Sequence, residues 1–225
     1  MRARRGVWLA GLLGAALCAS SGASATESED RPAWQPRTIL ALYKSSEAQI
    51  PEENPIRMML EFLLNDLGLV VHYHDITQGL PEDQDLRDVR GIVTWFSTPE
   101  MPDAQAYCDW LVRQIEAGRK VVIFSSMGAF VEAKSGETID WREAERVFTA
   151  LGARIDPALE PGHPDVVLAS SNDPALIAYE APIDPAELTF YQRVFATYPG
   201  SQPFLTVQLR GMENSDSQMI VVTPK

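Results

Sequence analysis

The chain has 225 residues, of which 45% are hydrophobic and 22% are charged, with a formal net charge of −12 at pH 7. These values are typical of a globular protein and exclude an intrinsically disordered chain, a collagen-like repeat and a disulfide-dense miniprotein. Because phosphate binding needs clustered lysine and arginine, the acidic balance predicts no nucleic-acid partner. It suits a cationic ligand, such as a partly deacetylated amino-sugar polymer, although acidity that simply keeps an exported protein soluble explains it as well.

The N-terminal 25 residues have the layout of a secretory signal peptide. Arg2, Arg4 and Arg5 form a charged start, an apolar run follows from Val7 to Leu17, and small residues end in Ala23-Ser24-Ala25. The apolar run is shorter than the roughly 20 residues of a membrane-spanning helix, so no stable membrane span is predicted. We expect cleavage near the last of these alanines and a periplasmic or secreted mature protein.

Residues 26–37 are polar and are predicted to form a flexible lead-in. From residue 38 to 152, apolar strands alternate with amphipathic helices. The predicted strands are residues 38–43, 69–76, 91–96 and 120–124, and the predicted helices are residues 54–67, 103–117 and 140–151. This alternation predicts an α/β fold with a mostly parallel sheet between two helical layers, a three-layer sandwich.

The first predicted helix has clear start and stop signals. Asn54 can cap it, Pro55 suits the first helical position, and Gly68 follows its end. Its apolar residues recur at helical spacing and predict one buried stripe made of Ile56, Met59, Leu60, Leu63 and Leu67.

After Gly152 the alternation stops and a β-rich extension, residues 153–225, is predicted. Its short apolar runs predict antiparallel strands at residues 165–169, 175–179, 193–197, 204–209 and 219–223. We expect the last two to form a hairpin joined by the polar stretch 210–218. Residues 38–225 are thus predicted to be a single α/β domain, with a βα core at 38–152.

Ligands of open parallel sheets bind beyond the carboxyl ends of the strands. A flavodoxin-like strand order would place the first and third strands side by side, so that their loops line one crevice. Aromatic faces suit sugar rings, and carboxylates and hydroxyls suit sugar hydroxyls. The candidate ligand-binding residues are Lys44, Ser45, Ser46, Glu47, Trp95, Phe96 and Ser126.

No complete catalytic constellation is visible. The run Ser126-Met127-Gly128 follows a buried strand, where hydrolases hold a nucleophile, but Phe124 replaces the first glycine of that motif. His72 and His74 share one face of a predicted strand, yet two nitrogens do not make a metal site. Cys108 lies mid-helix and is predicted to be a buried apolar residue. Phosphate-binding and dinucleotide-binding glycine motifs are absent, so no cofactor or metal is predicted.

The runs Ile39-Leu-Ala-Leu-Tyr43-Lys-Ser-Ser-Glu47, Leu64-Asn-Asp-Leu-Gly-Leu-Val-Val71 and Tyr73-His-Asp75 resemble a bacterial family. They are similar to the N-terminal domain of exported polysaccharide deacetylase-like proteins, over about residues 37–130. The resemblance implies a fold like class I glutamine amidotransferases and flavodoxin. Lys44 stands where the family pattern has an acid, and Ser125-Ser126 where an amidotransferase has its cysteine.

The resemblance implies an exported, non-catalytic accessory domain that binds a carbohydrate or a protein partner in exopolysaccharide metabolism. The alternative is a periplasmic hydrolase, a glycan deacetylase or an esterase-like enzyme, that uses Ser126 or the pair His72 and His74. A third hypothesis is a structural module that packs against a further domain.

Overall fold

The computed structural model describes residues 36–225 apart from 48–49, 162–165, 171–185, 188–189, 210–211 and 223–225. The predicted signal peptide, most of the predicted lead-in and the predicted strand at 175–179 lie outside the described residues. The described residues all belong to one unit, Gln35–Lys225. In the described ranges, the longest apolar stretches within helices are too short to cross a membrane.

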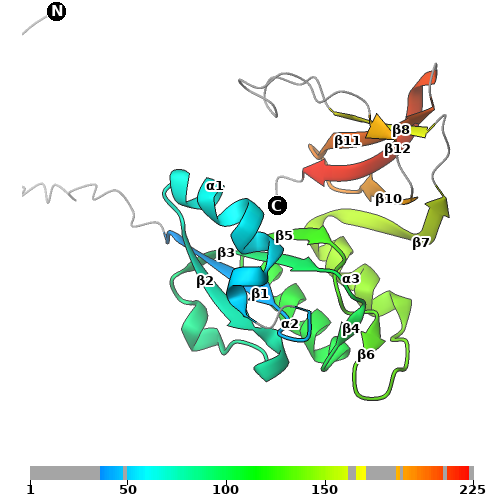
Figure 1. Cartoon of the computed structure of the whole chain (residues 1–225). Helices are drawn as coiled ribbons and strands as arrows, with labels where there is room; N and C mark the ends of the chain where they lie inside the picture. Colours follow the sequence, from blue (N-terminus) through cyan, green and yellow to red (C-terminus); the bar gives the residue numbers. More distant parts are fainter. Residues whose placement is uncertain are drawn as a thin grey trace, which may run out of the picture. The chain divides into compact units, whose positions relative to one another are not determined.

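Four parallel strands form the first sheet, in the order β2-β1-β3-β5 (Figure 1). The strands are β1 (Thr38–Tyr43), β2 (Val70–Asp75), β3 (Val89–Phe96) and β5 (Lys120–Ser125). The first and third predicted strands are therefore direct neighbours, with Leu40 opposite Ile92. This confirms the predicted α/β fold with a flavodoxin-like, mostly parallel sheet.

Helices cover the two faces of this sheet (Figure 1). The helices α2 (Ala104–Glu116) and α3 (Trp141–Leu151) pack against the face that carries Leu40 and Leu42. The opposite face carries Ala41, which packs with Ile56 of the first helical segment. Successive strand residues point to opposite faces, so one strand supplies both cores.

The first helical segment begins with a π-turn, η2 (Ile56–Leu60), and continues as α1 (Glu61–Asp66). Asn54 caps it as predicted, because its Oδ1 accepts from the backbone N–H of Ile56 at 2.8 Å. The predicted buried stripe is only partly right: Ile56 is buried and Leu60 packs half-buried against the same core, but Met59, Leu63 and Leu67 are exposed.

The π-turn explains this difference. The N–H of Glu61 donates to the carbonyl of Ile56, five residues back, so the first turn is wider than an α-turn. The inward residues then follow a spacing of four, at Ile56, Leu60 and Leu64. Met59 and Leu63, which an unbroken α-helix would bury, are rotated toward solvent.

Short elements connect the larger ones. They are the 3₁₀ turns η1 (Pro51–Glu53), η3 (Ile76–Gln78) and η4 (Asp83–Leu86) and the paired two-residue strands β4 (Glu100–Met101) and β6 (Val131–Glu132).

The β-rich extension forms an antiparallel sheet, as predicted, in the order β7-β10-β12-β11-β8-β9. Its strands are β7 (Ala153–Pro161), β8 (Val166–Ser170), β9 (Ala186–Glu187), β10 (Phe190–Ala196), β11 (Gln202–Leu209) and β12 (Met212–Val222). Strand β7 was not predicted; it lies at an edge of the sheet, where its prolines are tolerated. The predicted loop 210–218 is wrong for most of its length, because β12 already begins at Met212.

Candidate functional site

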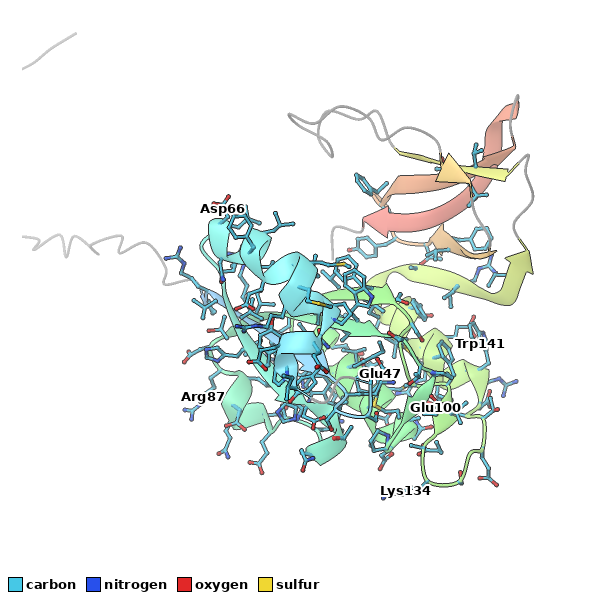
Figure 2. All side chains as sticks on the ribbon, viewed as in Figure 1. Glu47, Asp66, Arg87, Glu100, Lys134 and Trp141 are labelled. Carbon is cyan, nitrogen blue, oxygen red and sulfur yellow. The ribbon has the colours of Figure 1, made fainter. Side chains whose placement is uncertain are left out.

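The loops that follow β1 and β3 are joined by the carboxylate of Glu47, which Figure 2 labels. Its Oε2 accepts from the backbone N–H of Ser97 at 2.8 Å, and its Oε1 accepts from the N–H of Thr98 at 3.0 Å. The hydroxyl of Thr98 donates to the same Oε1 at 2.8 Å. The two loops therefore lie side by side at the carboxyl edge of the sheet.

Lys44 lies beneath these loops, with only 1% of its surface exposed. Its Nζ donates to the carbonyls of Thr98 at 2.9 Å and Glu100 at 2.8 Å, and it lies 2.7 Å from Oε1 of Glu47. It also sits over the ring of Phe96, 4.7 Å from the centroid, and Phe96 itself is fully buried. Lys44 and Phe96 thus support the loops from inside and do not line their surface.

The two carboxylates nearest this edge are hydrogen-bond acceptors. Burial raises the pKa of Glu47, but hydrogen bonds from Lys44, Ser97 and Thr98 outweigh it and hold the pKa below its usual range. The pKa of Asp75 is also lowered, since hydrogen bonds from Ser45 and Thr77 outweigh the effect of burial. Neither group has the raised pKa of a general acid.

Ser45 belongs to this hydrogen-bonded framework. Its backbone N–H donates to Oδ1 of Asp75 at 3.1 Å, and its Oγ lies 2.8 Å from Oγ1 of Thr77. The loop after β1 is therefore fixed to the loop after β2 as well as to the loop after β3. Ser46, in contrast, is exposed, as is Ser97 on the neighbouring loop.

An aromatic pair marks the β5 side of this edge. Trp95 and Phe124 are partly buried and stack with centroids 5.0 Å apart and planes 16° from parallel. They lie opposite each other on β3 and β5. Val122, on the same face of β5, is also exposed. Both rings also pack against the core of Ala41, Ile56 and Val93, so each keeps only part of its surface accessible. Of the two predicted aromatic residues, only Trp95 has accessible surface, and its partner Phe124 was not predicted.

The end of β5 has an unusual backbone conformation. Ser125 has a φ of 58°, and it alone among the non-glycine residues of the described ranges has a positive φ. Its side chain is exposed. A β-strand residue followed by a left-handed residue resembles the elbow that presents a nucleophile in hydrolases. The sequence motif pointed to the next residue, Ser126, and gave no signal for the strain at Ser125.

Ser126 stabilises the turn that follows β5 through two hydrogen bonds. Its Oγ accepts from the backbone N–H of Gly128 at 3.0 Å, and its own N–H donates to the carbonyl of Phe96 at 3.2 Å. Gly128 has a φ of +72°, and a Cβ there would lie 2.5 Å from the Phe96 ring. The turn therefore requires glycine at this position.

The histidine pair lies on β2, the edge strand at the other side of the sheet from β5. His72 and His74 are on β2, which β1 and β3 separate from β5 and Ser126. Three strand spacings amount to roughly 14 Å, too far for a hydrogen bond. Nε2 of His74 lies 2.7 Å from the carbonyl of Gly79. Across the ranges that the structure describes, histidine, cysteine and carboxylate side chains form no cluster of three suited to a metal ion.

Cys108 is buried in α2, as predicted. Burial, and to a smaller extent the charges of Glu143 and Asp109, raise the pKa of its thiol to about 12. A thiol in this environment is protonated at neutral pH and is not a nucleophile.

The sequence and the structure were compared with known proteins, with the following results. No protein-family model matches the sequence, and no curated protein matches it. The structure is similar to a glutamine amidotransferase from Methylobacillus flagellatus, with a TM-score of 0.43 and 14% identity, covering 78% of this chain and 63% of that one. A Thermotoga maritima glutamine amidotransferase gives a TM-score of 0.46 and 9% identity, covering 84% and 72%.

A third similar structure is a putative ThuA-like protein from Bacteroides uniformis, with a TM-score of 0.47 and 16% identity over 84% of this chain and 78% of that one. At these identities and TM-scores, no activity of the similar proteins is assigned to this chain. The fold assignment rests on the order and register of the parallel strands. The comparisons give no support to the resemblance to polysaccharide deacetylase-like proteins.

Proposed function

We propose that the chain is an exported, non-catalytic accessory domain that binds a carbohydrate at the carboxyl edge of its parallel sheet. The observation that carries the proposal is the partly exposed Trp95, stacked on Phe124 and placed just before the exposed Ser97. An aromatic face beside hydroxyl groups is the common arrangement for contacting a sugar ring.

The remaining polar groups at this edge support a binding role over a catalytic one. Glu47 and Asp75 are occupied by hydrogen bonds, and the hydroxyl of Ser126 accepts from Gly128. A pre-ordered framework of this kind lowers the conformational cost of binding. The exposed hydroxyls of Ser46, Ser97 and Ser125 are the groups that would contact the ligand, with the role in exopolysaccharide metabolism resting on the sequence resemblance.

The test is calorimetric titration of the chain with neutral and amino-sugar oligomers. We expect at least one oligomer to bind, and Trp95→Leu to weaken its binding at least tenfold. Trp141→Leu is the matched control, because Trp141 is also partly buried and stacked on a phenylalanine, Phe130, but lies on α3. Equal effects of the two substitutions, or no binding by any oligomer, would refute the proposed site.

A second candidate, a hydrolase, is favoured by the left-handed backbone of Ser125. Its hydroxyl would attack the carbonyl carbon of an ester or an O-acetyl group and expel the alcohol, which takes up the hydroxyl proton, and water would then release the acid from the acyl-serine. Hydrolysis of chromogenic esters and acetylated sugars should then be lost in Ser125→Ala and kept in Ser126→Ala. Activity that survives Ser125→Ala would exclude this assignment.

A further inference from the structure

We propose that the outward face of η2 and α1 is a docking surface for a second protein, which contributes a short apolar segment carrying lysine or arginine. We call this surface the outward face; it consists of Met58, Met59, Phe62, Leu63 and Leu67. The inference is independent of the proposed carbohydrate site, which lies at the carboxyl ends of the strands.

The exposure of this face is the first argument. Phe62 is 78% exposed and Leu67 is 74% exposed, and more than half of the surface of each of the other three is also accessible. Scattered apolar residues on a surface are ordinary, but five large ones within ten residues form a patch, and exposed apolar patches mark interaction sites.

The spacing of these residues makes the patch continuous. Met58 and Phe62 are four residues apart, as are Met59 and Leu63, and such pairs are neighbours on a helix surface. Leu67 follows Leu63 by one further turn. The inward residues Ile56 and Leu60 are the ones that pack with the sheet, so the outward face contributes little to the core. Methionine side chains adapt to different partners, which suits a docking surface.

The charge around the patch indicates what would bind there. Acidic residues accompany it along the chain: Glu52 and Glu53 on η1 before it, Glu61 within it, and Asp66, which Figure 2 labels, at the end of α1. Two cations are nearby. Arg57 is paired with Glu61 at 3.2 Å, and Arg37 lies against Gly68 beyond the helix. The flank therefore retains an acidic excess.

The acidic residues of this flank also raise the pKa of the neighbouring Tyr73. Tyr73 of β2 donates a hydrogen bond to Oε2 of Glu61 at 3.0 Å. Burial, this hydrogen bond and the charge of Glu61 raise the pKa of Tyr73, with a smaller contribution from Glu52. Glu52 and Glu61 thus both contribute to the negative electrostatic potential around Tyr73.

The negative charge of the flank favours a basic partner protein over a second copy of this chain. A second copy of this chain would bring the same acidic flank against itself, in a protein of net charge −12. A partner segment with apolar residues on one side and lysine or arginine on the other would satisfy both the patch and its flank. An amphipathic helix with this composition is the simplest such segment.

The test uses two synthetic 14-residue helical peptides with the same leucine pattern, one with lysine and one with glutamate at the polar positions. We expect the lysine peptide to bind the full chain, more weakly as salt is raised, and the glutamate peptide not to bind. Phe62→Ser with Leu63→Ser should lower the affinity at least tenfold. Because both side chains are exposed, circular dichroism and the urea midpoint should stay unchanged.

A charge-matched pair of variants distinguishes this surface from general acidity. Glu52→Lys with Glu53→Lys should weaken binding of the lysine peptide at least fivefold more than Asp85→Lys with Asp88→Lys, which changes the same charge at other exposed positions. Equal binding by all variants would refute the proposal. So would a self-associated chain in sedimentation that Phe62→Ser with Leu63→Ser dissociates, because a second copy would then occupy the face.

Discussion

Nζ of Lys44 lies 2.7 Å from Oε1 of Glu47, and this ion pair fixes the loop after β1 against the loop after β3. Lys44 is buried, so its charge has lost most of its contact with water. The carboxylate of Glu47 and the carbonyls of Thr98 and Glu100 replace that water. The pair therefore sets the shape of the carboxyl edge at which the proposed ligand would bind.

Replacing Glu47 by alanine should lower the free energy of unfolding by about 3 kcal/mol, because it leaves a buried ammonium without its carboxylate. Urea unfolding measures this change. The control is Arg57→Ala, which breaks the more exposed pair with Glu61 and should cost less than about 1 kcal/mol. Equal losses in the two variants would show that the Lys44 pair has no special role.

Stability should fall in acid because the pKa values of Glu47 and Asp75 are lowered in the folded state. Their contribution is fully present above the unfolded values of about 4 and is lost as pH falls through the folded values. We expect urea midpoints to be level near pH 6 and to decline below about pH 4. The decline should be shallower in Glu47→Gln; an identical pH profile in that variant would contradict the assignment.

Gly128→Ala should destabilise the fold more than Gly136→Ala, although both glycines have a φ of +72°. The shared backbone penalty is about 1 kcal/mol. A Cβ at Gly128 also meets the Phe96 ring at 2.5 Å, whereas a Cβ at Gly136 meets no atom within 4 Å. We expect a total of about 3 kcal/mol for Gly128→Ala. Thermal or urea unfolding of the two variants compares them, and equal costs would mean that the ring moves aside freely.

Cys108 should resist thiol reagents in the folded protein. With a pKa of about 12, its thiolate fraction at pH 8 is far below that of a free cysteine with a pKa near 8.5. In a Cys18→Ser chain, labelling by iodoacetamide at pH 8 should be at least a hundredfold slower before unfolding in urea than after it. Rapid labelling of the folded chain would mean that α2 opens readily.

The parallel sheet could be predicted because its strands are short and continuously apolar, as in residues 38–43 and 120–124, and are separated by capped helices. The proximity of Glu47 to Ser97 followed from the strand order. The inward direction of Lys44 did not, because a lysine at the end of a strand is usually solvated; its burial depends on acceptors more than 50 residues away.

Other features could not be predicted because no single residue type encodes them. The π-turn at Ile56–Leu60 is defined by its hydrogen bond over five residues. The residues of η2 and α1 are equally compatible with an α-helix, so the sequence gives no signal for it. The polar start of β12 became a strand because antiparallel pairing uses backbone groups and allows one face to meet water. The left-handed φ of Ser125 likewise reflects the turn around Phe96.

The wide turn of η2 holds one residue more than an α-turn, because the N–H of Glu61 bonds the carbonyl of Ile56, five residues back. If a chain of the same length closed this turn as an α-turn, every later residue would rotate by about 100° around the helix axis, so that Leu63 would turn toward the sheet and Leu64 away from it. Deleting one residue between Ile56 and Leu60 would instead remove the extra residue and leave the later side chains facing as they do now. The hydrogen-bond pattern of a single turn thus decides which leucines of this helix meet water.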